Sequence, residues 1–489
     1  MKAPVLLSDL AIISTIFFDT KSGLLIFDPE GFLQKDSSTV ESISCRSKKA
    51  LYKFCHQITI DFFLINLSDE VLPPAEFSKH LRGIIDFSGQ TFPQAKRHYY
   101  INNPDGAMRW FFPSKTTTAS FLSLYNSTGV KAYCFKQLAK ILSRIRCLSL
   151  LSAGSFAIWE SAGTNKKNWQ TELSFDDYAI FTGTVGENRK AIIALHQEQN
   201  CTHFLKIPLT KAARALTQNE AKQLAYLTRL KLQTIQVPSS QKIADTLLVS
   251  NVKTQGARNQ LAWTNVHSKA LAELYHLTVK REILRNLETW KELEASVRGL
   301  QAIEKIENNL PPQKLRYLTR LCHNQLQSIP PTERLSVGMA HGDFTPWNMY
   351  QSAEKLLVYD WEMSQMEMPL FFDVFHYIFQ KGILIERKTQ IAIEEEIEAI
   401  MEGGVLKDLQ GTYQVNWQLH YALYLIFIVS YYLPKYAIQP RLHLQVHWLL
   451  EHWTQALEKI TTPSRMTSKV KKHCVVKSQI IVETSENDN

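Results

Sequence analysis

Two short segments of the sequence combine carboxylate, amide and imidazole side chains at close spacing. The first is His341-Gly342-Asp343-Phe344-Thr345-Pro346-Trp347-Asn348, and the second is Val358-Tyr359-Asp360-Trp361-Glu362. The carboxylate of Asp343 can accept or orient the proton of a hydroxyl group. The amide oxygen of Asn348 and the carboxylate of Asp360, which ends an apolar run, are oxygen ligands of the kind that Mg²⁺ prefers beside phosphate and water. This spacing predicts a site for metal-assisted transfer of a phosphoryl group to a hydroxyl.

In order and separation, the two segments resemble the catalytic loop and the metal-binding segment of the aminoglycoside phosphotransferase and choline kinase family. The members of this family are relatives of protein kinases that phosphorylate small molecules, and the resemblance covers about residues 170–455. It implies an α+β fold class, in which a bilobal, protein-kinase-like domain has a small β-rich N-lobe and a large helical C-lobe. It also implies ATP and Mg²⁺ as cofactors and a small molecule with a hydroxyl group as the acceptor.

The same resemblance implies roles for the residues around the expected catalytic base, Asp343. His341 is also a candidate of the catalytic loop, but its expected role is to fix the shape of the loop and not to touch the substrate. Asp373 matches an acidic helix residue that ties this loop down, and Glu362 is expected in the outer shell of the metal. The pair Trp361-Glu362 stands where protein kinases have Phe-Gly, which resembles the small-molecule branch.

Candidate nucleotide-binding residues lie upstream of these motifs. Lys206 lies between apolar neighbours in a third predicted strand and is expected to bind phosphates, with Glu220 on the following helix as its partner. Gly183 and Gly186 lie in a turn between two predicted strands, where backbone N–H groups could cover the phosphates. An ordinary turn explains these glycines equally well. The backbone groups that would meet the adenine edge of the nucleotide are expected near Leu248–Val252.

The elements that must position these residues follow from the hydrophobic periodicity. Between residues 170 and 252 the expected order is three strands, a helix and a strand: Asp177–Phe181, Lys190–Leu195, Thr202–Ile207, Thr217–Leu230 and Thr246–Val252. Residues 253–460 are expected to be mostly helical, with long amphipathic stretches at His267–Asn286, Trp290–Asn308 and Gln313–Ser328. This change of period predicts an N-lobe and a C-lobe.

Residues 1–165 mix short β-rich runs with turn signals and one helical pattern at Tyr133–Leu151. They predict a separate, mixed α/β N-terminal domain of unknown role. The polar stretch Glu160–Glu172 is the candidate linker, so the kinase-like domain is expected to span residues 166–460. The last residues, 461–489, change from basic to acidic and are expected to form a disordered tail.

Composition limits the remaining possibilities. The 489 residues are 45% hydrophobic and carry 55 basic and 46 acidic side chains, which predicts a globular protein with a mild preference for anionic partners. Nucleic-acid binding is not expected, because no finger or RNA-recognition signature accompanies the dispersed basic residues. Seven scattered cysteines without a C-x-x-C pair favour a reducing cytoplasm. The apolar start is not expected to be a signal peptide, because Asp9 interrupts it and no small-residue cleavage site follows. Tyr421–Leu433 is too short to span a bilayer and is predicted to be a buried helix.

The acceptor and two alternative functions stay open at this point. A sugar or glycan-linked acceptor is preferred, although the acidic run Glu394–Glu398 would suit a cationic acceptor if it lined the pocket. The alternative from another class is a catalytically silent, nucleotide-binding scaffold protein. A protein kinase is disfavoured because only eight residues separate Asp360 from Pro369, which leaves no clear activation segment.

Overall fold

The computed structural model describes residues 5–18, 23–34, 42–90, 93–103, 106–116, 119–124, 130–161, 168–183, 186–305, 308–439 and 442–461. The chain divides into two compact units. The first comprises residues 1–231, 236–255 and 357–362, and the second comprises residues 232–235, 256–356 and 363–489. Beyond residue 461, the predicted disordered tail lies outside the described residues.

The first unit is built on one large mixed sheet. Its strands are β2 (Gly23–Phe27), β4 (Ser42–Cys45), β5 (Phe62–Asn66), β6 (Leu81–Asp86), β7 (Lys96–Asn102), β8 (Met108–Pro113), β9 (Gly154–Glu160), β10 (Asp177–Phe181), β11 (Lys190–Gln197), β12 (Asn200–Pro208), β14 (Ser240–Ile243) and β15 (Thr246–Ser250). They form a twelve-stranded sheet in the order β14-β15-β12-β11-β10-β8-β7-β9-β6-β5-β2-β4. Strands β4, β2, β5 and β6 are parallel, and the other neighbouring pairs are antiparallel. A separate parallel pair joins β1 (Val5–Leu6) to β3 (Leu33–Gln34).

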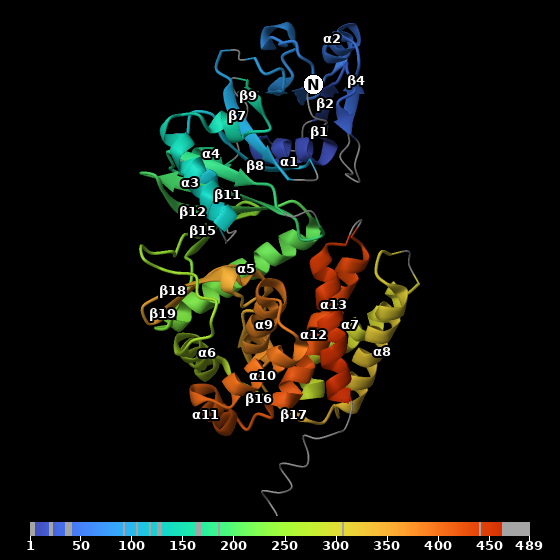
Figure 1. Cartoon of the computed structure of the whole chain (residues 1–489). Coiled ribbons are helices and arrows are strands. Elements are labelled where there is room, and N and C mark those ends of the chain that lie inside the picture. Colours follow the sequence, from blue (N-terminus) through green and yellow to red (C-terminus); the bar gives the residue numbers. More distant parts are fainter. Residues whose placement is uncertain are drawn as a thin grey trace, which may run out of the picture. The chain divides into compact units, whose positions relative to one another are not determined.

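Helices cover both faces of this sheet (Figure 1). The helical elements are α1 (Leu7–Phe17), α2 (Lys48–Gln57), α3 (Val130–Arg144), α4 (Asn168–Glu172), α5 (Lys211–Leu230) and the short 3₁₀ turns η1 (Pro74–Glu76), η2 (Ser120–Leu124) and η3 (Leu148–Leu151). Side chains along a strand point alternately to the two faces of the sheet, so neighbouring residues pack in different cores. Ile26 packs with α1, whereas Leu25 packs with α2, and Phe112 packs with α3 while Phe111 joins the α1 core.

One core crosses the predicted domain boundary near residue 165. It joins Leu10 of α1 to Ile180 of β10 and Leu205 of β12. Strand β10 also pairs directly with β8, with Ile180 opposite Phe111. Within the predicted linker, Trp169 of α4 is 3% exposed and its indole N–H donates to the carbonyl oxygen of Ile16 at 3.0 Å. Among the described residues of this unit, sheet and core thus run through the boundary, and β2 and β4 to β9 belong to the same sheet as the strands that follow.

The strands expected between residues 170 and 252 occur at β10, β11, β12 and β15. The helix between them, α5, begins six residues before the predicted start, because the side chain of Thr210 accepts a hydrogen bond from the N–H of Ala213 at 3.0 Å and caps it there. Strands β13 (Ile235–Gln236) and β14 were not predicted. The first is very short, and Ser240-Gln241-Lys242 in the second is polar and exposed.

The second unit is mainly helical. Its helices are α6 (Asn265–Thr278), α7 (Glu288–Ile303), α8 (Pro312–Ser328), α9 (Phe372–Lys381), α10 (Gln390–Met401), α11 (Gly404–Tyr413), α12 (Trp417–Ala437) and α13 (Leu444–Thr461). Helices α7, α8, α12 and α13 pack side by side (Figure 1). Strands β16 (Lys280–Ile283), β17 (Arg334–Ala340) and β20 (Gln365–Pro369) form an antiparallel sheet, and β13, β18 (Met349–Ser352) and β19 (Lys355–Val358) form another small sheet. The short turns are η4 (Leu284–Asn286), η5 (Pro346–Asn348), η6 (Trp361–Met363) and a π-helical turn at Gly382–Glu386.

Two helical predictions in this region have different outcomes. The stretch Tyr421–Leu433 lies within α12 and is largely buried, as predicted. The stretch His267–Asn286 is helical only to Thr278, because β16 then pairs with β17, with Lys280 opposite Val337. No helix in the described part of the chain combines the length and the apolar character that spanning a membrane requires.

Candidate active site

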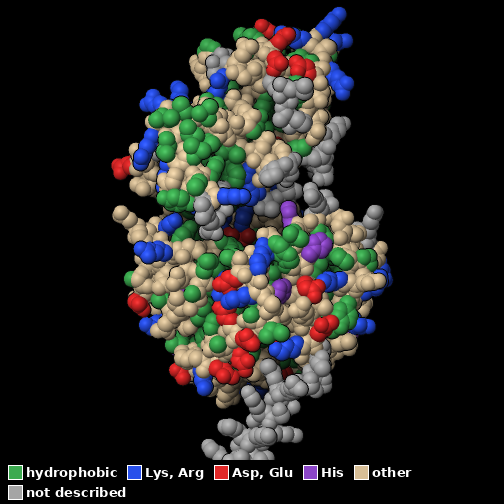
Figure 2. Space-filling view, in the orientation of Figure 1, with side chains coloured by type: hydrophobic (Ala, Val, Ile, Leu, Met, Phe, Trp, Pro, Cys, Tyr) green, Lys and Arg blue, Asp and Glu red, His purple; other side chains and the backbone are tan. Residues whose placement is uncertain are grey.

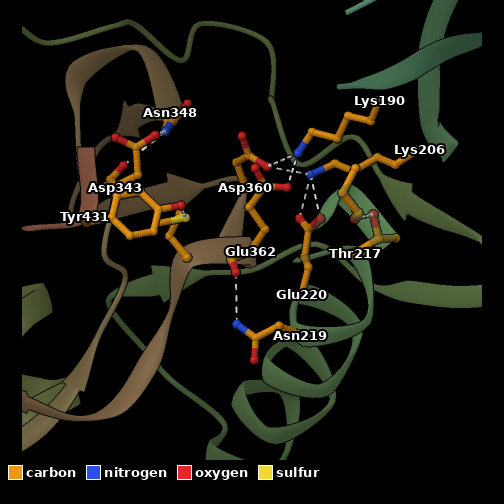
Figure 3. A network of polar contacts seen from close by, with 12 residues as sticks. Lys190, Lys206, Thr217, Asn219, Glu220, Asp343, Asn348, Asp360, Glu362 and Tyr431 are labelled. Atoms are coloured by element: carbon orange, nitrogen blue, oxygen red, sulfur yellow. Dashed lines mark hydrogen bonds and ion pairs between the residues drawn. The ribbon is translucent and has the colours of Figure 1, made fainter. Parts of the chain in front are cut away.

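The lysine and glutamate predicted to bind a nucleotide lie together in the first unit. The Nζ atom of Lys206, on β12, lies 2.6 and 2.7 Å from the two carboxylate oxygens of Glu220, on α5, and 2.7 Å from Oδ1 of Asp360. Lys190, at the start of β11, lies 3.4 Å from the same oxygen of Asp360 and forms an ion pair with Glu362. Figure 3 shows both lysine side chains pointing toward these carboxylates.

This group of charges can attract a cation. Two lysines, Lys190 and Lys206, face three carboxylates, Glu220, Asp360 and Glu362, so the formal charge of the group is 2 − 3 = −1. One oxygen from each carboxylate lies within 4.8 Å of the others. Carboxylate oxygens are the ligands that Mg²⁺ prefers, so the donor set fits that ion.

Burial and charge act together on the pKa values of this group. Burial lowers the pKa of Lys206, but the negative charges of Asp360, Glu220 and Glu362 outweigh burial and the net shift is upward. Burial, followed by the charge of Asp360, raises the pKa of Glu362 to about 7. A cation bound beside Glu362 would stabilise its ionised form and lower that pKa.

Local contacts fix the segment that carries Asp360. The backbone of Asp360 has φ 61°, a left-handed conformation that aspartate adopts more readily than most residues. Trp361 is fully buried, and its indole N–H donates to the carbonyl oxygen of Val358 at 3.1 Å. On α5, the amide of Asn219 donates to the carbonyl oxygen of Glu362 at 2.9 Å. The helix that carries Glu220 therefore also holds the segment that carries Asp360 and Glu362.

The glycine turn predicted to cover the phosphates joins β10 to β11. Gly183 has φ +78°, and a Cβ atom there would lie 2.1 Å from the carbonyl oxygen of Lys190, so only glycine fits. Gly186, at φ +154°, closes the turn, and residues 184–185 lie outside the described residues. The close approach at Gly183 brings the turn against the strand that begins with Lys190.

In the second unit, the loop that carries Asp343 follows β17 and is tied to α9. Gly342 has φ +83°, and a Cβ atom there would lie 2.4 Å from the carbonyl oxygen of Met363. The carboxylate of Asp373, on α9, accepts hydrogen bonds from the backbone N–H groups of His341 at 2.7 Å and Gly342 at 3.0 Å. His341 is fully buried, and its Nδ1 accepts the backbone N–H of Asp343 at 3.2 Å. These contacts hold the loop in one shape.

Both side-chain oxygens of Asp343 accept hydrogen bonds. Oδ2 accepts the amide Nδ2 of Asn348 at 2.8 Å, which turns the amide oxygen of Asn348 away from this carboxylate (Figure 3). Oδ1 lies 3.1 Å from Nε2 of His376, on α9, and Nδ1 of His376 lies 3.4 Å from the hydroxyl of Tyr424. The tautomer of His376 that donates from Nε2 satisfies both contacts. The Asp343 side chain stays 27% exposed, so it can still meet a substrate.

Asp343 also lines a pocket of about 260 Å³ in the second unit. This volume is slightly below the roughly 300–1,000 Å³ usual for ligand pockets. Its other lining residues are aromatic, amide, imidazole and aliphatic: Trp347, Gln380, Leu384, Tyr432, Tyr436, Gln439, His443, Gln445, Val446 and Leu449. Among the described residues that line it, Asp343 is the only carboxylate and there is no lysine or arginine. The Oε1 atom of Gln439 is buried and has no hydrogen-bond partner in the described part of the chain.

The predicted site residues thus form two groups, one in each unit. Lys206, Glu220, Gly183, Gly186, Asp360 and Glu362 belong to the first unit, and His341, Asp343, Asn348 and Asp373 belong to the second. Sequence reasoning missed Lys190, His376 and the aromatic residues of the pocket. His376 follows Asp373 by three residues, one helical turn, and that spacing could have indicated it. Lys190 is a lysine at the start of an apolar strand, and nothing in its sequence context distinguished it from other lysines.

No protein-family model and no curated protein sequence matches the chain. Among solved structures, the chain is similar to an ADP-bound aminoglycoside phosphotransferase, with 12% identity over 59% of this chain and 95% of that one and a TM-score of 0.37. The chain is also similar to a choline/ethanolamine kinase family protein from Mesorhizobium loti, with 13% identity over 58% of this chain and 88% of that one and a TM-score of 0.38. A glucosamine kinase is similar with 12% identity over 55% of this chain and 76% of that one and a TM-score of 0.36. At these identities and TM-scores, the likenesses decide neither the reaction nor the acceptor. The solved structures similar to this chain include the family that its two motifs resemble.

Proposed function

We propose that the chain is an ATP- and Mg²⁺-dependent phosphotransferase that moves the γ-phosphate to a hydroxyl group of a small, neutral molecule, a sugar or a glycan-linked acceptor. The observation that carries this proposal is the setting of Asp343. Its carboxylate lines a pocket while His376 and Asn348 hold its two oxygens. A carboxylate fixed in this way can orient an acceptor hydroxyl and take up its proton.

The first unit supplies the proposed nucleotide and metal site. Lys206, supported by Glu220, is the proposed partner of the α- and β-phosphates, and the turn of Gly183 and Gly186 is the proposed cover of the phosphates. Asp360 and, from the second unit, Asn348 are the proposed metal ligands, with Glu362 in the outer shell. Magnesium bound there would neutralise negative charge on the phosphates as the phosphoryl group moves.

In the proposed reaction, Asp343 accepts a hydrogen bond from the acceptor hydroxyl and aligns that oxygen. This oxygen forms a bond to the γ-phosphorus of ATP. At the same time the bond from the γ-phosphorus to the oxygen that bridges the β- and γ-phosphates breaks, and ADP leaves with that oxygen. The hydroxyl proton passes to the carboxylate of Asp343. His376 positions this carboxylate through Oδ1, and His341 and Asp373 hold the loop beneath it.

The lining of the pocket supports a neutral acceptor with several hydroxyl groups. Tyr432, Tyr436 and Trp347 offer apolar ring faces of the kind that stack on the C–H face of a sugar, and Gln439 offers a buried acceptor that a hydroxyl could satisfy. Burial, followed by the charge of Asp343, raises the pKa of Tyr432, which keeps its hydroxyl a donor. A polycation would leave positive charges without partners, because Asp343 is the only carboxylate among the described lining residues.

The acidic run Glu394–Glu398 gives no support to a cationic acceptor. Glu394 forms an ion pair with Lys459, and Glu396 lies 2.6 Å from Lys381 and 2.7 Å from Lys388. None of the run lines the described pocket. Its charges are compensated by neighbouring lysines or exposed to solvent.

A product screen tests the proposal directly. The full chain is incubated with ATP and Mg²⁺ and with separate pools of sugars, glycans, amino alcohols and aminoglycosides, and phosphorylated products are sought by mass spectrometry. We expect a sugar phosphate that disappears in Asp343→Asn. The matched control is Asp408→Asn, at an exposed aspartate of α11 outside the pocket, which should leave turnover unchanged.

Other outcomes have distinct meanings. A phosphorylated aminoglycoside or amino alcohol without any sugar product would contradict the neutral acceptor but keep the phosphotransferase. No product from any pool, together with tight nucleotide binding, would instead support the catalytically silent scaffold.

A further inference from the structure

Helix α3 has an exposed apolar face in addition to the apolar face that it buries. The buried face packs beside β8 and β10 through Ala139 and Leu142. On a different side of the helix, Leu138, Ile141 and Ile145 leave 47%, 55% and 60% of their surfaces exposed. A helix that only covered the sheet would need one apolar face, so the second face requires a separate explanation.

Another aliphatic residue is exposed in the short turn that follows the helix. Leu150, in η3, is 75% exposed and lies five residues after Ile145. We refer to Leu138, Ile141, Ile145 and Leu150 as the α3 face. Figure 2 shows hydrophobic side chains gathered on this part of the first unit, with Lys and Arg side chains at their edge.

Basic residues accompany the α3 face. Lys136, Lys140 and Arg144 follow one another at four-residue intervals and therefore form a stripe along the helix. From residue 130 to residue 153 the sequence has five Lys and Arg residues and no Asp or Glu. Burial, followed by the positive charges of Lys253 and Lys140, lowers the pKa of Lys136. This surface is therefore locally positive and should attract an anionic partner.

We propose that the α3 face docks the protein on the surface of an anionic lipid bilayer. Aliphatic side chains beside a row of Lys and Arg are the pattern of a helix that lies in the plane of a membrane interface. The aliphatic residues enter the boundary of the acyl chains, and the cations contact lipid phosphates.

Two other classes of partner fit these residues less well. A single-stranded nucleic acid binds through successive aromatic side chains that stack on bases, whereas the α3 face is aliphatic and Tyr133 is the one strongly exposed aromatic residue among the described residues of α3. An amphipathic peptide helix docks in a hydrophobic groove, and neither pocket described in this chain, of about 870 Å³ beside β7 and β10 or about 260 Å³ at Asp343, is lined by α3. A row of exposed aliphatic residues accompanied by basic residues suits a planar, anionic surface.

Vesicle sedimentation of the full chain tests this proposal. We expect the protein to sediment with vesicles of phosphatidylcholine and phosphatidylglycerol but not with phosphatidylcholine alone, and added salt should weaken binding. The variants Ile141→Ser/Ile145→Ser and Lys140→Glu/Arg144→Glu should each weaken binding by at least about tenfold. The matched controls are Ile391→Ser, at a residue of α10 that is 67% exposed, and Lys407→Glu, at an exposed lysine of α11. Both controls should bind like the original chain.

Three results would overturn the proposal. The first is an absence of sedimentation with anionic vesicles, and the second is equal sedimentation with both kinds of vesicle. The third is a concentration-dependent dimer in analytical ultracentrifugation that Ile141→Ser/Ile145→Ser abolishes without any lipid binding, which would assign the face to a second copy of the chain. Circular dichroism of each variant separates loss of binding from loss of folding.

Discussion

Asp343 and Lys206 have different environments, although both are proposed to act on the same reaction. Asp343 is partly exposed and accepts hydrogen bonds from two side chains, so it is positioned but remains accessible. Lys206 is 6% exposed and is held by two carboxylates. A change near Asp343 should therefore affect mainly turnover, whereas a change at Lys206 should affect stability as well.

His376 is expected to position Asp343. His376→Phe removes the donor to Oδ1, so we expect kcat for the acceptor found by the product screen to fall by about 10- to 100-fold, because small displacements of a catalytic group are costly. His376→Gln, which can still donate, should recover part of the loss, and KM for ATP should change little. Steady-state kinetics measure both values.

A second buried histidine provides the control for His376. His420, on α12, contacts the carbonyl oxygen of Leu370 at 3.0 Å and not Asp343. His420→Gln should therefore leave kcat within a few-fold of its original value. Equal losses in His376→Phe and His420→Gln would show that the effect came from general loosening of the helices.

Lys206→Met should destabilise the protein by about 3–5 kcal/mol, because it leaves the buried carboxylate of Glu220 without its closest cation. Urea unfolding measures this free energy. Lys206→Met/Glu220→Gln should be more stable than Lys206→Met alone, since it removes the uncompensated charge. Lys269→Met, which breaks an exposed ion pair with Glu354, should cost less than about 1 kcal/mol. A single variant at Lys206 as stable as the original chain would contradict this account.

At the scale of elements, one helix supports each group of site residues. Helix α5 contributes Glu220 and, through Asn219, holds the backbone at Glu362. Helix α9 contributes Asp373 and His376, which lie one turn apart and hold the loop and the carboxylate of Asp343. The same faces of these helices are largely buried, so the rigid core fixes the positions of the site residues.

The element β7 carries a buried histidine that should make stability depend on pH. Nε2 of His98 lies 2.6 Å from the hydroxyl of Tyr178, Nδ1 lies 3.2 Å from the carbonyl oxygen of Lys96, and burial lowers the pKa of His98 to about 3. In the unfolded chain the pKa of a histidine is about 6.5. Between about pH 3 and about pH 6.5, His98 therefore binds a proton in the unfolded chain but not in the folded chain. The free energy of unfolding should therefore fall as the pH falls below about 6.5, by up to about 1.4 kcal/mol per pH unit from this residue.

His98→Gln removes that titration and tests it. The difference in unfolding free energy between the original chain and the variant should stay constant from about pH 7 to pH 8, and should change by about 1.4 kcal/mol per pH unit from about pH 6 to pH 5. Urea unfolding at each pH measures the difference. A constant difference over the whole range would mean that His98 has nearly the same pKa in the folded and the unfolded chain.

At the scale of the whole molecule, ligand binding should be visible as stability. ATP with Mg²⁺ should raise the melting temperature, since a ligand that binds only the folded state contributes about 2.7 kcal/mol at a hundred times its Kd. EDTA should reduce the shift, because it removes the ion proposed to bind at Asp360. Thermal unfolding followed by circular dichroism measures these changes.

Two variants separate nucleotide binding from catalysis in the same assay. Asp343→Asn should keep the nucleotide-dependent shift, because its proposed role is toward the acceptor. Lys206→Met should lose most of the shift, whereas Lys269→Met should keep it. A full shift in Lys206→Met would place the nucleotide elsewhere on the chain.

Local pattern was sufficient for the strands β10, β11, β12 and β15 of the twelve-stranded sheet and for the positions of the motifs. Strands β10, β11 and β12 are continuous runs with apolar residues. Gly342 and Gly183 mark turns where positive φ values and the close approach of a backbone carbonyl oxygen favour glycine. By contrast, β16 is the charged stretch Lys280-Arg281-Glu282, and only its pairing with β17 makes it a strand. The position of a strand inside a sheet is set by a distant partner that local periodicity does not report.

The sequence alone determined that the chain has a phosphotransferase-like pair of motifs, because the types and spacing of His341, Asp343, Asn348 and Asp360 are local properties. Only the tertiary structure decided that β2 and β4 to β9 share a sheet with the strands after them, since Ile180 and Phe111 meet across the predicted boundary. It also brought Lys190 to Glu362 and His376 to Asp343, and it left Leu138, Ile141 and Ile145 exposed. These outcomes depend on which surfaces pack together, and burial is a property of the folded chain that no short stretch of sequence contains.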